Sequence, residues 1–340
     1  MHMKSVIVGC GTIAAVHAKS LKQLPDCELV AFADIKIERA ENFAATYGGK
    51  AYADYQEMLE KEQPDVMHIC TPHYLHTPMA AYALSKGINV FMEKPPVISY
   101  EQLDELKAAV AGSKARLGLC YQNRYNRCVQ FAKQMIASGE AGKILGARGL
   151  VTWYRDAPYY TESGWRGVLA TEGGGALINQ SIHTLDLLRY FLGEPLWAES
   201  TMSNHHLKGV IEVEDTVEAY VNFEKASGIF FATTAYHTNI APLIEIDCEN
   251  VCFRMEDPEL TLYYKDGRIE KPELEHVESL GKSYWGSSHA TAIADYYDCV
   301  KTGRHFPLEL PDMEDSIRLF LAVYESAREG KPVTISEKAI

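Results

Sequence analysis

The sequence predicts an α/β protein in which a doubly wound parallel-sheet domain precedes an α+β domain built on a large, mostly antiparallel open sheet. Over the first ~120 residues, short apolar runs alternate with longer helical patterns, which is typical of parallel strands joined by crossover helices. Beyond residue 124 the strand patterns lengthen and alternate apolar with polar side chains. We therefore expect two domains, residues 1–123 and residues 124–340.

Six parallel strands are expected in the N-terminal domain, because its nearly continuous apolar runs are typical of strands buried on both faces. They lie at 6–8, 29–33, 51–52, 66–70, 90–92 and 117–120. The helical patterns between them lie at about 13–24, 37–47, 54–61, 77–86 and 99–112. The rules of crossover handedness and strand order then favour a Rossmann-like sheet with helices on both faces.

The C-terminal domain is expected to begin with a helix at 126–138 and to end with helices at 286–302 and 312–329. Its clearest strand is 217–223, where apolar and polar residues alternate. Further strands are expected at 144–155, 197–206, 228–237, 242–248, 251–256 and 260–265. Lys265-Asp266-Gly267-Arg268 indicates a hairpin. We expect helices to cover one face of this sheet and to leave the other available for contact.

Composition restricts the class of protein and its partners. The 340 residues include 33 Lys and Arg and 46 Asp and Glu. The resulting formal net charge of −13 argues against nucleic acid or a membrane as a partner. The apolar stretches fall short of the ~18 residues of a membrane helix, and the strand-like run at the start predicts no leader. Eight scattered cysteines indicate reduced thiols and a cytoplasmic protein. Cys248 and Cys252 lack a second ligand pair, so no metal site is expected.

A glycine-rich segment, Gly9-Cys10-Gly11-Thr12-Ile13-Ala14, follows the first predicted strand and opens a predicted helix. Gly9 permits the tight turn, Gly11 lets backbone amides approach a pyrophosphate, and Ala14 allows close helix–strand packing. The phosphates would bind at the positive helix N-terminus, which begins at Thr12 and Ile13. The pattern can also be only a tight turn, but its place on the first strand favours dinucleotide binding.

Asp34 ends the second predicted strand, 25 residues beyond Gly9. A carboxylate there accepts hydrogen bonds from both ribose hydroxyls and repels a 2′-phosphate, which favours NAD over NADP. Lys36 and Arg39 lie nearby and keep NADP as the lesser alternative. The alternative interpretation of Asp34 itself is an N-cap of the following helix.

Two further motifs follow the fourth and fifth strands, at the edge of the sheet that faces the cofactor in doubly wound folds. Thr71, Pro72 and His76 lie after the fourth strand, and Glu93 and Lys94 lie after the fifth. We expect these five residues to contact the cofactor. Lys94 is also placed to hydrogen-bond or protonate a substrate oxygen, although a lysine in such a turn is more often a surface residue.

The glycines at 173–175 precede a helical pattern that carries polar residues on one face. Asn179, His183 and, slightly off the row, Asp186 are spaced i, i+4 and i+7. A histidine there can accept an alcohol proton as the hydride leaves. The alternative is a histidine that is hydrogen-bonded within a domain interface.

An aromatic and basic loop leads into these glycines. It comprises Trp153-Tyr154-Arg155, Tyr159-Tyr160 and Trp165-Arg166. Sugars pack on aromatic faces and accept hydrogen bonds from planar donors. Tyr154, Arg155, Trp165 and Arg166 are therefore candidates to bind a polyol, with packing at a domain interface as the alternative.

Taken in order, these motifs resemble the Gfo/Idh/MocA oxidoreductases, the family of inositol dehydrogenases and glucose–fructose oxidoreductases. The resemblance covers essentially the whole chain. Its motifs are Gly9–Ala14 with His17, Thr71-Pro72 with His76, Glu93-Lys94-Pro95, Trp165-Arg166-Gly167, the triple glycine with His183, and Tyr324-Glu325-Ser326-Ala327 before Gly330-Lys331-Pro332. It implies NAD(P)-dependent hydride transfer at a secondary alcohol or ketone of a sugar or cyclitol, with Lys94 and His183 as the catalytic pair. It also implies homodimers or homotetramers formed through the large sheet.

One position departs from the pattern of many members, which carry Asp four residues before the catalytic histidine. Here that residue is Asn179, whose amide can hydrogen-bond a substrate hydroxyl but cannot act as a base. The proton role then falls on His183, with Lys94 orienting the oxygen. Two alternatives stay open: an NAD-dependent redox-type glycoside hydrolase or lyase that oxidises C3 transiently, and a non-enzymatic dinucleotide-binding redox sensor.

Overall fold

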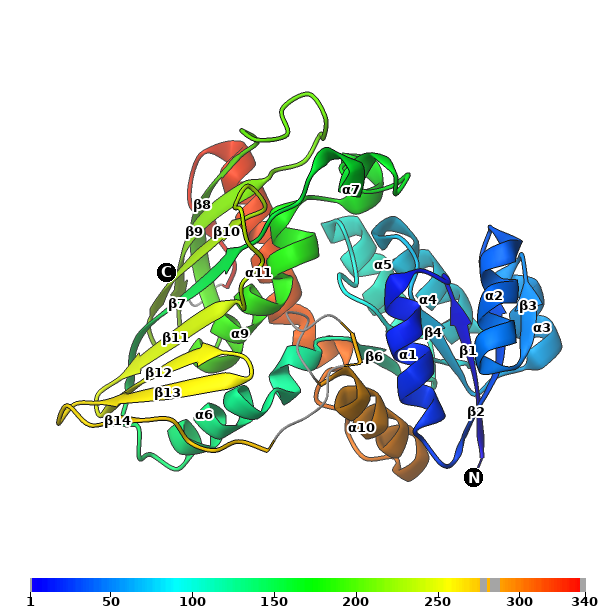
Figure 1. The fold of residues 1–340 in the computed structure, drawn as a ribbon, viewed down its shortest axis with the longest axis horizontal. Coiled ribbons are helices and arrows are strands. Elements are labelled where there is room, and N and C mark those ends of the chain that lie inside the picture. The colour runs from blue at the N-terminus through cyan, green and yellow to red at the C-terminus, as the bar shows by residue number, and fades with distance from the viewer. Residues whose placement is uncertain (1, 276–279, 282–287, 337–340) are drawn as a thin grey trace. The chain divides into compact units, whose positions relative to one another are not determined.

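The computed structural model describes residues 2–275, 280–281 and 288–336, which divide into two compact units (Figure 1). Unit 1 comprises the described residues up to Gln122 and those of the segment that ends at Met313. Unit 2 begins at Asn123 and includes the chain from Glu314 onward. Within the described ranges, no helix is long and apolar enough to cross a membrane.

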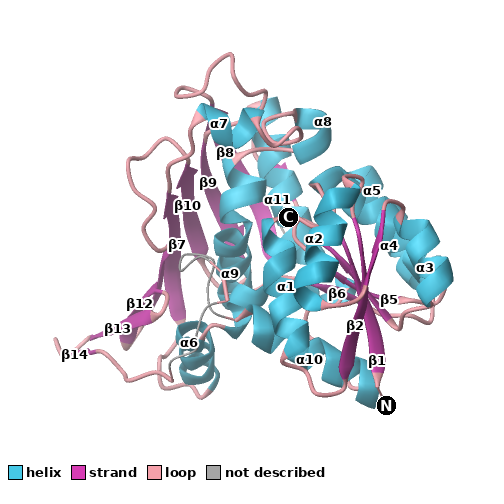
Figure 2. Cartoon of the chain, turned by 45° about the vertical axis from the view of Figure 1, so that its right-hand side comes forward, coloured by secondary structure: helices cyan, strands magenta, loops and turns pink. Residues whose placement is uncertain are grey.

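Unit 1 contains a parallel six-stranded sheet in the order β3-β2-β1-β4-β5-β6, which confirms the predicted doubly wound sheet. The strands are β1 (Met3–Val8), β2 (Cys27–Ala33), β3 (Lys50–Tyr52), β4 (Val66–Ile69), β5 (Asn89–Met92) and β6 (Leu117–Leu119). Their helices are α1 (Thr12–Lys22), α2 (Ile37–Tyr47), α3 (Tyr55–Glu62), α4 (His76–Ser85), α5 (Tyr100–Ala111) and α10 (His289–Thr302). Figure 2 shows α1, α2 and α10 on one face of the sheet and α3, α4 and α5 on the other. The central strands are apolar because both of their faces are buried.

The order of the strands reverses between β1 and β4, which pair in parallel with Val8 opposite Ile69. In doubly wound sheets ligands bind at such a reversal, beyond the carboxyl ends of the strands. The loops that follow β1, β2, β4 and β5 all leave the sheet at this edge. A short 3₁₀ helix, η1 (His73–Leu75), lies in the loop after β4.

Unit 2 contains a nine-stranded sheet in the order β14-β13-β12-β11-β7-β10-β9-β8-β15. All neighbours are antiparallel except β7 and β10, so the predicted, mostly antiparallel sheet is confirmed. The strands are β7 (Ile144–Thr152), β8 (Pro195–Ser203), β9 (Thr216–Phe223), β10 (Ser227–Thr233), β11 (Leu243–Cys248), β12 (Val251–Glu256), β13 (Glu259–Tyr264), β14 (Ile269–Glu270) and β15 (Val333–Thr334). Its helical segments are η2 (Gln122–Tyr125), α6 (Arg127–Ala137), α7 (Ala157–Thr161), α8 (Leu169–Glu172), η3 (Ala176–Ser181), α9 (Ile182–Leu192) and α11 (Leu310–Glu329), of which η2 and α11 begin in unit 1.

The two faces of this sheet differ in their surroundings. Strand β9 alternates buried with more exposed residues, as its period of two predicts, and α9 packs against β7, β10 and β11. The opposite face carries apolar side chains at the surface: Leu145 is 57% exposed, Ile229 58% and Tyr220 41%. One face of the sheet therefore holds the core of unit 2, and the other presents apolar area to its surroundings.

Several element boundaries in unit 2 differ from the prediction. Strand β7 ends at Thr152 rather than 155, since Tyr154 makes only an isolated bridge to Ala235. The predicted regular helix after the triple glycine is wrong over its first turn, which is the π-helix η3. The short helices α7 and α8 and the strand β15 were not predicted. The first residues of the helix expected at 286–302 lie outside the described residues.

Candidate active site

The loop after β1 brings two glycines into different surroundings. Gly9 has φ +85°, and a Cβ there would lie 2.7 Å from the carbonyl of Cys70 and 2.8 Å from the amide nitrogen of Thr71. Only glycine fits this position, because the loops after β1 and β4 approach closely and the conformation is left-handed. A Cβ on Gly11 would meet no atom of the described residues within 4 Å. The backbone is therefore open to a ligand at Gly11.

Helix α1 begins directly at this open backbone. Gly11 is its N-cap, no side chain among the described residues caps it, and its first turn carries no acidic residue. The amides at the start of the helix, including those of Thr12 and Ile13, thus face a position where a ligand can accept their hydrogen bonds. Since a helix N-terminus favours anions, this loop fits the pyrophosphate of a dinucleotide.

Asp34 lies at the carboxyl end of β2 and is tied to the same loop. Its Oδ2 accepts a hydrogen bond from the amide of Cys10 at 2.9 Å, and its Oδ1 accepts one from the amide of Lys36 at 2.8 Å. The next residue, Ile35, is 90% exposed. Asp34 therefore holds a carboxylate beside the glycine loop, where it fits the ribose hydroxyls of NAD.

His76, by contrast, is committed to the backbone of unit 1. Its ring is 1% exposed, with Nδ1 2.7 Å from the carbonyl oxygen of Pro95 and Nε2 2.8 Å from that of Thr71. Burial lowers the pKa of His76, and a neutral ring donates only one of these two hydrogen bonds at a time. The histidine connects the loop after β4, which contains Pro72, to the loop after β5.

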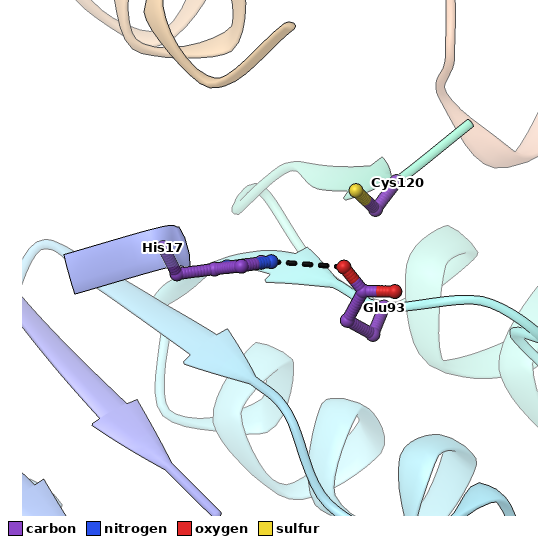
Figure 3. Close-up of side chains that lie close together, drawn as sticks. All are labelled: His17, Glu93 and Cys120. Carbon is purple, nitrogen blue, oxygen red and sulfur yellow. Dashed lines mark hydrogen bonds and ion pairs between the residues drawn. The ribbon is translucent and has the colours of Figure 1, made fainter. Parts of the chain in front are cut away.

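Glu93 and Lys94 follow β5 at the same edge of the sheet. Glu93 is 6% exposed, and its Oε1 lies 2.9 Å from His17 Nε2 on α1 (Figure 3). Burial raises the pKa of Glu93, but the hydrogen bond and charge of His17, with the charges of His289 and Lys94, outweigh it and lower the pKa. Glu93 is therefore an anion beside the half-buried Lys94.

Among the described residues, one group of His, Cys and acidic side chains is compact enough to consider for a metal ion. Its members are His17, Glu93 and Cys120, whose ligand atoms lie within 4.8 Å of one another (Figure 3). Burial and the charge of Glu93 raise the pKa of the Cys120 thiol well above its ordinary value. Since metal ions bind the thiolate, a neutral thiol makes this a poor metal site.

In unit 2, two of the three consecutive glycines are required by close contacts. A Cβ on Gly174 would lie 2.0 Å from the hydroxyl oxygen of Tyr324, and one on Gly175 would lie 2.0 Å from the carbonyl oxygen of Glu214. Glu214 in turn accepts hydrogen bonds from the amides of Gly175 and Leu177 and from Tyr324, each at 2.9 Å. The glycines therefore anchor the start of η3 against α11.

The three polar residues predicted on one helix face separate into two groups. Asn179 lies in η3 and His183 in the first turn of α9, and both are half-buried. Asp186 is 3% exposed and forms a two-pronged ion pair with Arg124, at 2.9 and 2.6 Å, and a hydrogen bond with Ser316 at 2.6 Å. Asp186 therefore stabilises the fold of unit 2 through these contacts. Asn179 and His183 remain as the candidate active-site residues of this segment.

A carboxyl group that the sequence analysis missed lies behind Asn179. The side-chain amide of Asn179 donates a hydrogen bond to Oε1 of Glu172 at 2.5 Å, and the amide of Gly167 donates one to Oε2 at 2.5 Å. Burial raises the pKa of Glu172 to about 7, although the Gly167 and Asn179 hydrogen bonds and the charge of Arg166 oppose the rise. The signal in the sequence is an acidic residue directly before the triple glycine.

The aromatic and basic loop stacks its guanidinium groups on its rings. The guanidinium carbon Cζ of Arg166 lies 4.6 Å from the ring centre of Tyr159 and 4.8 Å from the ring centre of Trp165. Arg155 lies 5.1 Å from the ring centre of Tyr159, while Tyr154 is 40% exposed. The stacked planes offer aromatic faces and hydrogen-bond donors together. They connect to η3 because the side chain of Gln180 donates a hydrogen bond to the hydroxyl of Tyr159 at 3.2 Å.

The fold and these groups define a dinucleotide-binding oxidoreductase with a separate α+β domain. Residues 3–121 match the family model described as "Oxidoreductase family, NAD-binding Rossmann fold", and residues 129–254 match the "GFO/IDH/MocA C-terminal domain". The two matches together span more than half of the chain. The chain belongs to the Gfo/Idh/MocA family, and its cofactor is NAD.

Individual relatives resemble the chain over nearly its whole length. It is 27% identical to the D-glucoside 3-dehydrogenase of Escherichia coli K12, with 98% of this chain and 97% of the relative covered. It is 25% identical to the scyllo-inositol 2-dehydrogenase (NAD(+)) of Bacillus subtilis 168, with 99% and 97% covered. The WlbA dehydrogenase of Bordetella pertussis, solved with NADH and UDP-GlcNAcA, has a TM-score of 0.84 at 25% identity, with 98% and 99% covered. A levoglucosan dehydrogenase solved with NADH and levoglucosan has a TM-score of 0.89 at 22% identity, with 99% and 100% covered, and shows the shared fold.

Proposed function

We propose that this enzyme oxidises or reduces a secondary alcohol of a sugar, a sugar derivative or a cyclitol. NAD, when bound, accepts or returns the hydride. The observation that carries the proposal is that Lys94 lies two residues beyond the end of β5, at the sheet edge that also bears the open backbone of Gly11 and the carboxylate of Asp34. The sugar and cyclitol dehydrogenases among the relatives support the substrate class.

The cofactor-binding residues of this proposal all belong to unit 1. The amides of Gly11, Thr12 and Ile13 bind the pyrophosphate, and Asp34 binds the ribose hydroxyls. Gly9 permits the approach of the loops after β1 and β4. The remaining cofactor-binding residues are Thr71, Pro72, His76, Glu93 and Lys94. Of these, His76 acts by fixing the loops after β4 and β5 rather than by presenting its own ring.

The chemical roles fall on three residues. His183 accepts the proton of the substrate hydroxyl as the hydride leaves, and Lys94 orients and polarises that oxygen. Asn179 hydrogen-bonds a substrate hydroxyl, with its amide held by Glu172. Because an amide cannot accept the proton, His183 is the base.

The substrate-binding residues outside this set are Tyr154, Arg155, Trp165 and Arg166. Their stacked rings and guanidinium groups present apolar faces and fixed donors, which suit the alternating C–H and O–H groups of a sugar ring. The stacking on Tyr159 supports a rigid binding surface.

We also propose that the exposed face of the nine-stranded sheet forms a homodimer or homotetramer interface. The apolar side chains of Leu145, Tyr220 and Ile229 on this sheet support it. The eight free cysteines support a reducing, cytoplasmic location.

A substrate panel tests the proposed function. Cyclitols, hexoses, uronates, amino sugars and glycosides are each incubated with NAD or NADP, and formation of the reduced nucleotide is followed by absorbance. Accumulation of NADH with one of these compounds is the expected result. Cleavage of a glycoside without accumulated NADH would instead identify a redox-type hydrolase or lyase, and no reaction with any compound would favour a redox sensor.

A further inference from the structure

A chain of hydrogen-bonded polar side chains runs from Glu93 through the interior of unit 1. Oε1 of Glu93 lies 2.9 Å from Nε2 of His17 (Figure 3), and Nδ1 of His17 lies 2.8 Å from Nδ1 of His68. Nε2 of His68 lies 2.9 Å from the hydroxyl oxygen of Tyr297, which lies 2.6 Å from Oγ of Ser5. Five side chains from five different parts of the sequence are thus linked without a break.

This chain is buried along its length and approaches the surface at its far end. His17, His68 and Ser5 are fully buried, and Tyr297 is 4% exposed. Oγ of Ser5 lies 3.2 Å from Sγ of Cys27, which is only half-buried at the start of β2. Cys27 is therefore the most exposed residue along the chain of hydrogen bonds.

The walls around the two histidines are apolar. The ring of Phe91 lies 5.8 Å from that of His17 and 5.3 Å from that of His68, and Phe91 is itself fully buried. Polar groups in such surroundings cost free energy unless each finds a partner. Both ring nitrogens of His17 and of His68 have a hydrogen-bond partner. A buried polar network in which every member is hydrogen-bonded is stable.

The network can exist with its hydrogen bonds pointing in either direction. A neutral imidazole donates through one nitrogen and accepts through the other. Burial lowers the pKa of His68 well below its ordinary value, which keeps that ring neutral. When Glu93 is an anion, the N–H and O–H bonds point toward it; when Glu93 carries a proton, all of them point toward Cys27. The two arrangements differ only in the positions of protons along the chain.

We propose that this chain of side chains, hereafter the buried relay, carries protons between Glu93 and solvent at Cys27. The inference rests on the proposed function, because oxidation of an alcohol by NAD leaves one proton to be removed for each hydride transferred. Glu93 precedes Lys94 in the sequence, and its Oε2 accepts a hydrogen bond from the backbone N–H of Lys94 at 3.2 Å. The relay thus connects the vicinity of the catalytic lysine with the opposite end of the sheet.

Each transfer along the buried relay breaks one bond to hydrogen and forms another. A proton that reaches Glu93 does not remain on the carboxylate, because its pKa is lowered. It passes to Nε2 of His17 while the Nδ1 proton of His17 passes to Nδ1 of His68. The Nε2 proton of His68 passes to the oxygen of Tyr297, whose own proton passes to the serine hydroxyl. The serine proton then passes to the sulfur of Cys27, whose thiol proton leaves to water. One proton enters and one leaves, and nothing is oxidised or reduced.

The decisive experiment measures how fast the imidazole N–H protons of the relay exchange with water. The full-length protein, labelled with ¹⁵N-histidine and saturated with NAD, is studied by NMR with saturation transfer from water. Tyr297→Phe and the double variant Ser5→Ala/Cys27→Ala each interrupt the relay, because the hydroxyl of Tyr297 interacts with Cys27 as well as with Ser5. Tyr296→Phe is the matched control, because Tyr296 is also fully buried but donates its hydroxyl to the backbone carbonyl of Arg116 at 3.0 Å.

Both interrupting variants are expected to slow exchange of the His17 and His68 protons by about tenfold or more, since exchange must then await local opening of the fold. The control variant should exchange like the wild type. If the His17 and His68 protons exchanged as fast in both interrupting variants as in the wild type, the relay would be disproved. If Tyr297→Phe fails to fold, the double variant Ser5→Ala/Cys27→Ala decides the question alone.

A second arm separates this inference from the proposed function. With a substrate from the panel, NADH formation and proton release are followed in one stopped-flow experiment with a pH indicator. In Tyr297→Phe the release of the proton should lag behind the first turnover of NADH, whereas in Tyr296→Phe the two should coincide. If no substrate yields NADH, the proposed function has failed, and the exchange rates still decide whether the relay conducts protons.

Discussion

The side-chain amide of Asn179 donates a hydrogen bond to the buried carboxyl group of Glu172, 2.5 Å away. This contact fixes the orientation of the amide and places a titratable group directly behind it. Because burial raises the pKa of Glu172 to about 7, the carboxyl changes its charge near neutral pH. Asn179 cannot act as a base itself, but the group that holds it can change its protonation state.

Replacing Glu172 by Gln should change how stability depends on pH. A glutamate with a folded-state pKa of about 7, above its ordinary 4.5, holds its proton more tightly in the folded chain. Its contribution to stability is therefore fully present below about pH 4.5 and is lost as the pH rises through about 7, at no more than ~1.4 kcal/mol per pH unit. Urea unfolding at about pH 5 and about pH 8 should show that the wild type loses stability relative to Glu172→Gln as the pH rises. An unfolding free-energy difference independent of pH would contradict the raised pKa.

The catalytic roles predict large losses of rate from single substitutions. His183→Ala and Lys94→Ala should each lower kcat by ~10²-fold or more, because each removes a group that handles the proton or the oxygen. Binding of NAD, measured by fluorescence titration, should change little in His183→Ala, because His183 is not among the cofactor-binding residues. The exposed His237 and Lys86 provide the controls His237→Ala and Lys86→Ala. Full turnover by both active-site variants would disprove the assignment.

Asp34 should control the choice of nucleotide. Asp34→Ala should weaken NAD binding by about tenfold to a hundredfold, because hydrogen bonds to a charged group contribute about 1.5–3 kcal/mol. The same change should narrow the preference for NAD over NADP, since the charge that repels a 2′-phosphate is gone. Glu38→Ala, which removes an exposed acidic residue from the first turn of α2, is the control. Calorimetry gives the dissociation constants for both nucleotides. An unchanged ratio of the NAD and NADP dissociation constants in Asp34→Ala would contradict this role of Asp34.

The triple glycine should tolerate no side chain at its centre. In Gly174→Ala the new methyl group would lie 2.0 Å from the hydroxyl oxygen of Tyr324. The strain should lower the free energy of unfolding by about 1–3 kcal/mol. Gly146→Ala in β7 is the matched control, because its Cβ would make an ordinary contact of 3.6 Å. Equal urea midpoints for the two variants would show that η3 can shift away from α11.

The sheets could be predicted from the sequence because burial on one or both faces leaves a direct trace in side-chain pattern. The parallel strands of unit 1 are buried on both faces and so appear as continuous apolar runs, and β9 is buried on one face and so alternates. A strand of two residues, such as β15, leaves no pattern of its own. It forms only because Val333 and Thr334 pair with β8.

The sequence motifs indicated which residues to consider for the candidate site, but not the contacts that hold those residues in place. The spacing of Asn179, His183 and Asp186 correctly indicated a helical segment, but periodicity cannot distinguish a π-helical turn from an α-helical one. The ion pair of Asp186 with Arg124 joins residues that are 62 positions apart. Likewise, nothing local in the sequence indicates that His17 meets His68, because that contact depends on how α1 lies against β4.

Hydride transfer from a substrate carbon to NAD can be followed with deuterium. The wild-type protein is incubated with NAD and with sugars and cyclitols deuterated at every ring carbon, and the nicotinamide is analysed by mass spectrometry. At least one compound should give deuterium to the nicotinamide, and His183→Ala and Lys94→Ala should abolish or strongly slow this transfer. An absence of deuterium in the nicotinamide with every compound, from a protein that still binds NAD, would contradict the proposed hydride transfer.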